Sequence, residues 1–249
     1  MVSWGWRIPF LIGCLIIPML FWLRSSLVET EVFLKSRHPR ATGEVLRILV
    51  DHWPVVTIAM GMQIFATTTF YLITVYTPTF GDQALHLPPL GSLLTTFCVG
   101  LTIFIFIPIG GALSDRIGRM PLVVATSLLV MATVFPAMSW LVAAPSFSAL
   151  LIVELWLSFL NAIFTGAVAP LIIEMMPEKA RTSGTGLAIS LANGVFGSFT
   201  PAISALLIET TGNRASPALW ITCTGAIALL PALAVNRFAS ASSRLDALA

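Results

Sequence analysis

Seven long apolar stretches constrain what this chain can fold into. Each has close to the ~20 residues that a helix needs to cross the hydrocarbon core of a bilayer. Of 249 residues, 57% are hydrophobic and only 10% are charged, and a soluble chain of this size cannot bury so much apolar surface. The stretches cover residues 6–23, 54–80, 90–113, 121–143, 147–173, 185–209 and 217–236. We therefore predict an all-α membrane protein with seven transmembrane helices.

The Lys and Arg residues lie mainly on one side of the predicted membrane. Only Arg7 and Arg214 belong to the other side; the rest occupy the connectors after the first, third and fifth stretches and the C-terminal tail. Such positive charge marks cytoplasmic segments. We therefore predict that the N-terminus faces away from the cytoplasm and that the C-terminus is cytoplasmic. The expected location is the bacterial inner membrane, with the N-terminus in the periplasm. The net charge of +2 does not indicate nucleic-acid binding.

The connector between the third and fourth stretches combines glycine with charge. Gly110 and Gly111 permit two helices to approach closely, and a glycine at the connector permits a turn with positive φ. Asp115 can pair with either arginine of the connector, so we expect a charged latch that holds one conformation and releases another. The candidate gating residues are Gly111, Asp115, Arg116, Gly118 and Arg119.

A second charged connector follows the fifth stretch. Pro177 prevents the helix before it from continuing. We expect Glu174 to pair with Arg181 across the turn, and both are candidate gating residues. An exposed ion pair of this kind contributes only about 0–1 kcal/mol to stability.

The two connectors resemble the signature elements that follow the second and fourth helices of a six-helix half in the major facilitator superfamily. Met120 stands where the first element usually has another basic residue. The resemblance implies a partial major facilitator fold: residues 1–23 are the last helix of the N-terminal half, 24–53 the central cytoplasmic loop, 54–236 the C-terminal six-helix bundle and 237–249 a cytoplasmic tail. The chain then corresponds to helices six to twelve of twelve, and we expect the others to be truncated or separately encoded.

Four further segments resemble a narrower family. Residues 4–13 and 29–33 are similar to the metabolite:proton symporters, and residues 67–81 and 139–147 to the citrate–proton symporters among them. The resemblance implies proton-coupled symport of a small carboxylate such as citrate. The expected partners are the carboxylate, a proton, membrane lipid and a separately encoded N-terminal half. No cofactor or metal is expected.

The second stretch carries an unusual number of hydroxyl groups. We expect Thr67, Thr68, Tyr71 and Thr74 to line the path of a polyoxygenated substrate, together with Asn161 and Asn193 from later stretches. The alternative is hydrogen bonding between helices, worth about 1 kcal/mol or less per bond. No Lys or Arg lies deep in any stretch. An anionic substrate would therefore take its positive partners from helices outside this chain.

Glu154 is the acidic residue that lies clearly within a stretch. A carboxyl group removed from water favours its neutral form and can therefore carry a proton. We predict that Glu154 couples transport to proton movement. Its position about two turns from the outward end would also allow contact with water.

Several alternatives remain at this stage. The chain can be a symporter of another metabolite or osmolyte, a non-functional transporter fragment, or a seven-helix receptor, and residues 1–23 also have some features of a signal peptide. A retinal protein is excluded, because its Schiff base needs an intramembrane lysine and Lys35 and Lys179 lie in connectors. An enzyme is not expected, because the three histidines lie in connectors as well.

Overall fold

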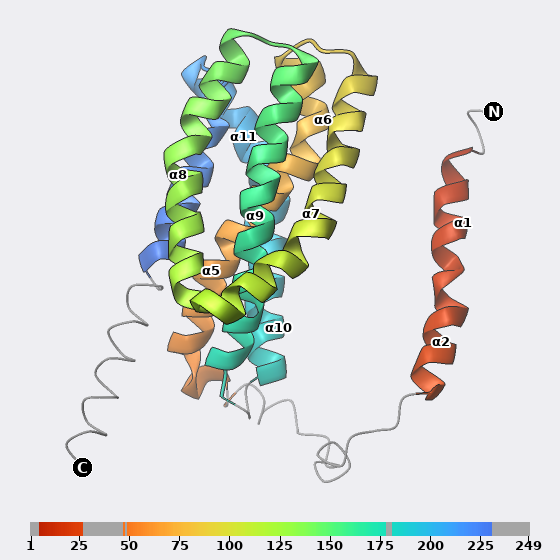
Figure 1. The fold of residues 1–249 in the computed structure, drawn as a ribbon, viewed down its shortest axis with the longest axis vertical. Helices are drawn as coiled ribbons and strands as arrows, with labels where there is room; N and C mark the ends of the chain where they lie inside the picture. Colours follow the sequence, from red (N-terminus) through yellow and green to blue (C-terminus); the bar gives the residue numbers. More distant parts are fainter. Residues whose placement is uncertain (1–4, 27–46, 48, 178–180, 231–249) are drawn as a thin grey trace. The chain divides into compact units, whose positions relative to one another are not determined.

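The computed structural model describes residues 5–26, 47, 49–177 and 181–230. The chain divides into two compact units, Met1–Thr42 and Gly43–Ala249, which are described separately. In the first unit, the short 3-10 turn η1 (Gly5–Arg7) leads into α1 (Ile8–Cys14) and α2 (Ile16–Ser26) (Figure 1). The apolar part of this helical segment, Phe10–Leu23, is shorter than a typical spanning helix.

The second unit is a bundle of long helices (Figure 1). The span Trp53–Ala84 consists of α5 (Trp53–Tyr71), the π-helical turn η2 (Leu72–Tyr76), α6 (Thr77–Thr79) and the π-helical turn η3 (Phe80–Ala84). Next come α7 (Pro89–Ile117), α8 (Arg119–Ala143) and α9 (Phe147–Met175). The span Arg181–Thr211 consists of α10 (Arg181–Leu191), the π-helical turn η4 (Ala192–Gly197) and α11 (Ser198–Thr211), and a shorter helix, Pro217–Leu230, follows.

The prediction of an all-α membrane fold is confirmed. In the described residues, five helices are long and apolar enough to cross a membrane, and they match the second to sixth predicted stretches. The first and seventh stretches coincide with the two shorter apolar helices; residues 231–236 of the seventh lie outside the described residues. The predicted central loop and C-terminal tail also lie largely or wholly outside them, so the domain boundaries stay a prediction.

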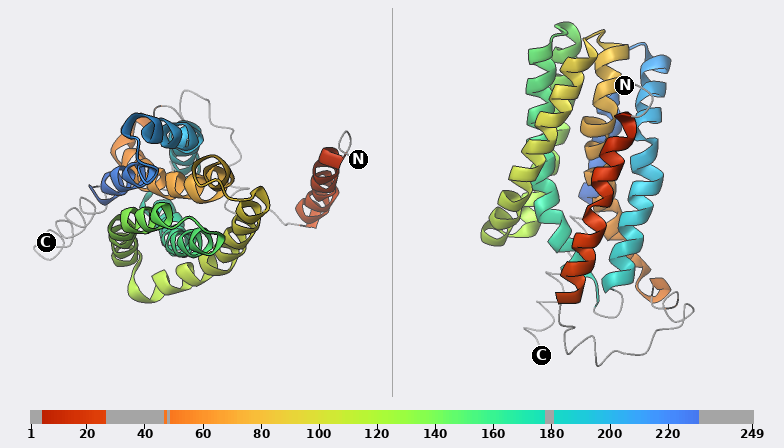
Figure 2. Two further views of the ribbon diagram at one scale, coloured as in Figure 1. Left: turned by 90° about the horizontal axis from the view of Figure 1, so that it is seen from above. Right: turned by 90° about the vertical axis from the view of Figure 1, so that its right-hand side faces the viewer.

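The bundle has two groups of helices (Figure 2). In one group, α9 packs against both α7 and α8. In the other, α5 packs against α10, η4 and α11. The two groups meet where α5 packs on α9, and the rings of Phe65 and Phe164 contact each other edge to face there, with centroids 4.9 Å apart. Side chains of α5, α9 and η4 can therefore converge inside the bundle.

Local sequence explains where the long helices begin and end. Pro88 has an extended backbone and α7 starts at the next proline, which needs no N–H partner. Gly118, the single residue between α7 and α8, has φ of +100°, a conformation that disfavours any other residue. Ser146 caps α9, because its hydroxyl accepts a hydrogen bond from the backbone N–H of Ala149 at 3.1 Å.

Glycines bring the backbones of α7 and α9 together. A Cβ added to Gly110 would lie 2.8 Å from Cα of Ile163, and one added to Gly166 would lie 2.7 Å from the backbone nitrogen of Gly111. Only residues without side chains fit such distances. The close approach that we expected is therefore present at Gly110, with α9 as the partner, whereas a Cβ at Gly111 would make only an ordinary contact, 3.7 Å from the backbone oxygen of Gly166.

Replacing Gly166 by Ala is expected to destabilise the bundle. Alanine favours a helix by about 0.5–1 kcal/mol over glycine, but overpacking costs about 1–3 kcal/mol, and here the obstacle is backbone that cannot rotate away. The matched control is Gly100→Ala, since nothing lies within 4 Å of a Cβ at Gly100. Thermal unfolding in detergent should show a lower Tm for Gly166→Ala only. Equal Tm values would contradict the close packing.

Candidate functional site

A cavity with mixed polar and apolar walls lies where α5, α9 and η4 meet. Its volume is about 250 Å³, large enough for a small organic molecule or several water molecules. Amide and hydroxyl groups lie among apolar and aromatic side chains in its walls, and none of the described residues that line it is charged. The lining residues are Gln63, Ala66, Thr67, Phe70, Tyr71, Thr165 and Asn193.

One hydrogen bond joins α5 to η4 beside this cavity, and a second lies within α5. The Thr67 hydroxyl donates to Oδ1 of Asn193 at 2.6 Å, and Nε2 of Gln63 donates to the Thr67 hydroxyl at 3.3 Å. Because Oδ1 of Asn193 accepts from Thr67, its amide nitrogen is left as the donor toward a ligand. A carboxylate or hydroxyl oxygen is the matching acceptor.

Asn161 holds the α9 wall of the cavity. Its Nδ2 donates to the backbone oxygen of Ala66 at 3.3 Å, and its Oδ1 accepts from the Thr165 hydroxyl at 3.0 Å. Asn161 is itself buried, only 4% exposed. It therefore positions Thr165, which lines the cavity, and links α9 to α5.

Backbone geometry also shapes the cavity. Asn193 lies in the π-helical turn η4, and Tyr71 immediately precedes the π-helical turn η2. Such turns often occur at functional sites, because the wider coil redirects side chains. Gly197 lets η4 approach α5, since a Cβ there would lie 2.9 Å from Cε2 of Tyr71.

The structure brings together only part of the predicted substrate path. Thr67, Tyr71 and Asn193 line the cavity, and Asn161 lies directly behind it. Thr68 is fully buried elsewhere on α5, with its hydroxyl 3.0 Å from that of Thr224. Thr74 donates to the backbone oxygen of Phe70 and is not among the lining residues. A substrate role for any of them stays a prediction.

Sequence reasoning missed Gln63, and it did not include Thr165, a polar residue of the fifth stretch, in the predicted substrate path. Gln63, Thr67 and Tyr71 follow one another at a spacing of four residues, which places them on one face of a helix. That spacing could have predicted that Gln63 lies on the same face of the helix as Thr67 and Tyr71. Thr165 has the same relation to Asn161, one turn further along α9.

Glu154 lies outside the cavity, near the beginning of α9. It is 3% exposed, and it is the only carboxylate among the buried side chains of the described residues. Its Oε2 has no hydrogen-bond partner among the described residues. Glu154 is therefore enclosed by the bundle. The contact with water that its position in the sequence would have allowed is not present.

At the opposite end of the bundle, Arg119 joins three helices. Its guanidinium lies 2.7 Å from Oε1 of Glu174 at the end of α9 and 3.4 Å from Oδ1 of Asp115 at the end of α7. Glu174 thus pairs with Arg119 instead of the predicted Arg181. The reason is tertiary: α8 begins with Arg119 beside the end of α9, whereas Arg181 belongs to the next helix. Arg116, the other predicted partner of Asp115, is exposed.

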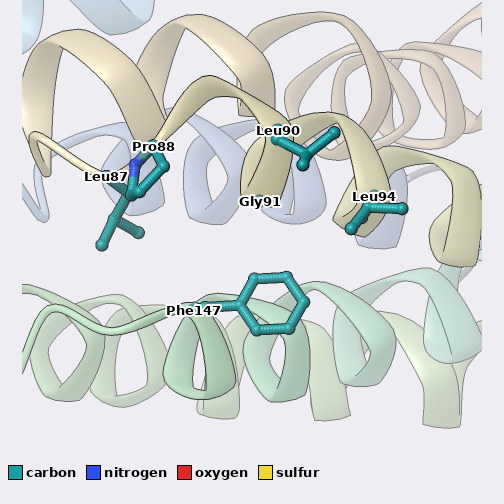
Figure 3. Close-up of a pocket in the computed structure, with 6 residues that line it drawn as sticks. All are labelled: Leu87, Pro88, Leu90, Gly91, Leu94 and Phe147. Carbon is teal, nitrogen blue, oxygen red and sulfur yellow. The ribbon is translucent and has the colours of Figure 1, made fainter.

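A second, apolar cavity of about 270 Å³ opens where α7 and α9 begin (Figure 3). Phe147 of α9 faces the start of α7 across it (Figure 3). The lining residues are Leu87, Pro88, Leu90, Gly91, Leu94 and Phe147. With no polar side chain in its walls, this cavity does not suit a carboxylate.

Comparison with known proteins identifies the family. Residues 83–245 match the model of the Major Facilitator Superfamily. The chain is 49% identical over 228 residues to the citrate-proton symporter of Klebsiella pneumoniae, covering 92% of this chain and 51% of the relative. For the citrate-proton symporter of Salmonella typhi the identity is 47% over 221 residues, covering 89% and 51%. No solved structure gives a significant match.

More distant relatives have other substrates in their names. The proline/betaine transporter of Escherichia coli K12 is 26% identical over 253 residues, covering 96% of this chain and 50% of the relative. The chain thus spans about half the length of the curated relatives it matches, and these relatives are transporters rather than enzymes. With its apolar spanning helices, it is a multi-pass inner-membrane protein. The matched model and the helical bundle together place this chain in the major facilitator superfamily, as a C-terminal part of that fold.

Proposed function

We propose that this chain is the C-terminal part of a proton-coupled symporter for a small carboxylate such as citrate. The observation that carries the proposal is the cavity between α5, α9 and η4, whose walls include amide and hydroxyl groups. It lies in a chain that is 47–49% identical, over the matched residues, to two citrate-proton symporters. Secondary transporters bind substrate at the interface between structural repeats, near the middle of the membrane. The residues that line the cavity would then form one wall of the binding site, and a separately encoded N-terminal half would form the other wall.

The cavity walls suit this role chemically. Amide and hydroxyl groups offer hydrogen bonds to the carboxyl and hydroxyl oxygens of a substrate without binding it too tightly to release. Because none of the lining residues is cationic, the charge of a carboxylate substrate would be balanced by the N-terminal half. Transport would proceed as the two halves rock around the bound substrate and expose it alternately to each side.

Proton coupling would reside at Glu154. The residue is buried in α9, the same helix that supplies Thr165 to the cavity. A carboxyl in such a place can bind a proton on one side of the membrane and release it on the other. The excess of Lys and Arg in alternate connectors supports a periplasmic N-terminus and a cytoplasmic C-terminus. Membrane lipid would cover the exposed apolar surface of the bundle.

The Asp115–Arg119–Glu174 cluster would then lie at the cytoplasmic end, holding α7, α8 and α9 together in one state of the cycle. Arg119→Gln is expected to alter the transport rate severalfold by shifting this equilibrium, yet to change the free energy of unfolding by less than about 1 kcal/mol, because the pairs are partly exposed. Arg116→Gln is the control on the same connector. A transport rate of Arg119→Gln equal to that of the unmodified chain would show that Arg119 has no role in gating.

One other function has specific support. The neutral walls of the cavity also suit a zwitterionic osmolyte, and the relatives at 26% identity include proline/betaine transporters.

A competition assay separates the two functions. Vesicles would contain this chain and the N-terminal half of the Klebsiella pneumoniae relative, and radiolabelled citrate exchange would be measured against excess unlabelled citrate or betaine. Inhibition by citrate alone supports the carboxylate proposal, whereas labelled betaine exchange without citrate exchange supports the osmolyte alternative.

A further inference from the structure

The hydrogen bonds of Asn161 fix the direction in which Thr165 donates. Nδ2 of Asn161 lies 3.3 Å from the backbone oxygen of Ala66, and its Oδ1 lies 3.0 Å from the Thr165 hydroxyl. A backbone oxygen can only accept, so the amide nitrogen of Asn161 faces Ala66 and the amide oxygen faces Thr165. That amide oxygen accepts the single hydrogen of the Thr165 hydroxyl. Because Asn161 is buried, the bundle around it holds this orientation.

Thr165 is therefore an acceptor toward the cavity. It is half-buried and lines the cavity between α5, α9 and η4. A threonine hydroxyl has one hydrogen and two lone pairs, and the hydrogen of Thr165 is donated to Asn161. A ligand group that contacts this oxygen must bring a hydrogen of its own. A charged carboxylate has no such hydrogen, whereas an alcohol hydroxyl has one.

The η4 side of the same cavity has the opposite polarity. Oδ1 of Asn193 accepts from the Thr67 hydroxyl at 2.6 Å, which leaves the amide nitrogen of Asn193 as a donor. A carboxylate oxygen is the matching group for that donor. The two walls therefore suit different parts of one molecule, a carboxylate at Asn193 and a hydroxyl at Thr165.

The other polar groups in the walls do not distinguish a hydroxyl from a carboxylate in this way. Thr67 is only 3% exposed, and its hydroxyl already donates to Asn193 and accepts from Gln63. The Tyr71 hydroxyl can both donate and accept, and the amide of Gln63 carries a donor and an acceptor. Among the described residues that line the cavity, Thr165 is thus the one whose remaining capacity favours a hydroxyl over a carboxylate.

We propose that Thr165 is a specificity-determining residue of the cavity: its oxygen accepts a hydrogen bond from a hydroxyl group of the substrate. The cavity then selects a hydroxycarboxylate, such as citrate, over the same carboxylate without the hydroxyl. This inference rests on the proposed function and deepens it, because it names the substrate class within the small carboxylates. Asn161 is the positioning residue, because it takes up the hydrogen that Thr165 could otherwise donate to a carboxylate.

The test compares citrate with tricarballylate, which has the same three carboxyl groups but no hydroxyl. Vesicles would contain this chain and the N-terminal half of the Klebsiella pneumoniae relative, and uptake of radiolabelled citrate would be measured against each unlabelled compound. For the unmodified chain, half-inhibition should need about tenfold more tricarballylate than citrate, because bound tricarballylate leaves the Thr165 oxygen unpaired.

Thr165→Val should affect the two compounds differently. The substitution keeps the shape of the side chain but removes the acceptor, so the citrate hydroxyl loses its partner. The KM for citrate should rise about fivefold, the usual contribution of one hydrogen bond. Tricarballylate no longer meets an unpaired oxygen, so it should inhibit at an equal or lower concentration. Damage to the fold would weaken the binding of both compounds alike.

Two further variants make the result specific. Thr165→Ser keeps the hydroxyl and should keep the preference for citrate. Thr126→Val is the matched control, because Thr126 is buried on α8 and its hydroxyl donates within its own helix, to the backbone oxygen of Leu122 at 2.7 Å. The loss of that hydroxyl should leave the inhibition by both compounds unchanged.

The outcomes separate this inference from the proposal on which it rests. A preference for citrate that Thr165→Val abolishes and Thr165→Ser keeps supports the hydroxyl contact. If tricarballylate inhibits the unmodified chain as well as citrate does, or if the preference survives Thr165→Val, the inference is overturned and the carboxylate function stands. Equal weakening of both compounds by Thr165→Val also overturns it, because the Thr165 oxygen then serves a carboxyl group or the wall itself. Absence of citrate uptake by the unmodified chain with its N-terminal partner removes the proposed function as well.

Discussion

Glu154→Gln is expected to abolish citrate accumulation driven by a proton gradient while citrate exchange continues. Glutamine has nearly the shape of a protonated glutamic acid, so the buried site stays packed, but it cannot release a proton. Without proton release the loaded carrier cannot complete a coupled cycle. Citrate exchange requires only that the citrate-bound carrier alternates between its two orientations. Because Glu154→Gln resembles the protonated state, this variant should still exchange citrate.

Glu209→Gln gives the matched control for this experiment. Glu209 lies near the end of α11 and is exposed, so the same substitution there changes charge without touching the buried site. Accumulation and exchange would be measured in the same vesicles for all variants. Accumulation by Glu154→Gln at the level of the unmodified chain would show that Glu154 does not couple transport to the proton.

Thr67→Val is expected to weaken citrate binding strongly. The substitution keeps the side-chain shape but removes the hydroxyl that accepts from Gln63 and donates to Asn193. Both amides would then be free to rotate away from the substrate. A hydrogen bond to a charged group is worth about 1.5–3 kcal/mol, so the KM for citrate should rise roughly tenfold or more. Tyr71→Phe, which removes another hydroxyl from the cavity wall, should raise KM in the same direction.

The control for the cavity variants is again Thr126→Val, a threonine of α8 that hydrogen-bonds only within its own helix. Initial rates of citrate uptake over a range of concentrations would separate KM from the maximal rate. A rise in KM without loss of protein from the membrane is the predicted pattern. An unchanged KM in both Thr67→Val and Tyr71→Phe would show that the substrate binds elsewhere.

Hydropathy was sufficient to predict the all-α membrane class and the positions of the long helices. The stretches at 90–113, 121–143 and 147–173 coincide with the inner parts of α7, α8 and α9, because a bilayer demands a long apolar helix wherever the chain crosses it. The turn at Gly118 was equally readable, since a single residue between two helices requires an unusual φ. The positions of these helices and of this turn depend only on the local sequence and on the lipid bilayer that surrounds the chain.

The candidate site was predictable only in part, because helix rotation and helix pairing are tertiary properties. The hydroxyls of α5 predicted a polar helix, yet they could not show that Thr68 turns toward Thr224 while Thr67 turns toward the cavity. An ideal α-helix would place Thr74 on nearly the same face as Thr67. Thr74 itself lies in the wider π-helical turn η2, where the register of an ideal α-helix no longer holds, and it is not among the lining residues.

The ion pair at Glu174 has the same explanation. Its predicted partner, Arg181, is near in sequence, but the partner in the structure, Arg119, comes from another connector. Two charged connectors that follow different helices meet because α7, α8 and α9 pack together. The spacing of residues in the sequence does not predict that Arg119 and Glu174 lie in contact.

The central claim is that this chain forms part of a proton-coupled carboxylate transporter, and one uptake measurement tests it most directly. Radiolabelled citrate uptake would be followed in membrane vesicles under an imposed inward proton gradient, for this chain alone and for this chain together with the N-terminal half of the Klebsiella pneumoniae relative. We predict uptake in the combined sample only, and its collapse when an uncoupler dissipates the gradient. Absence of uptake in both samples despite confirmed membrane insertion, or uptake that the uncoupler does not affect, would contradict the claim.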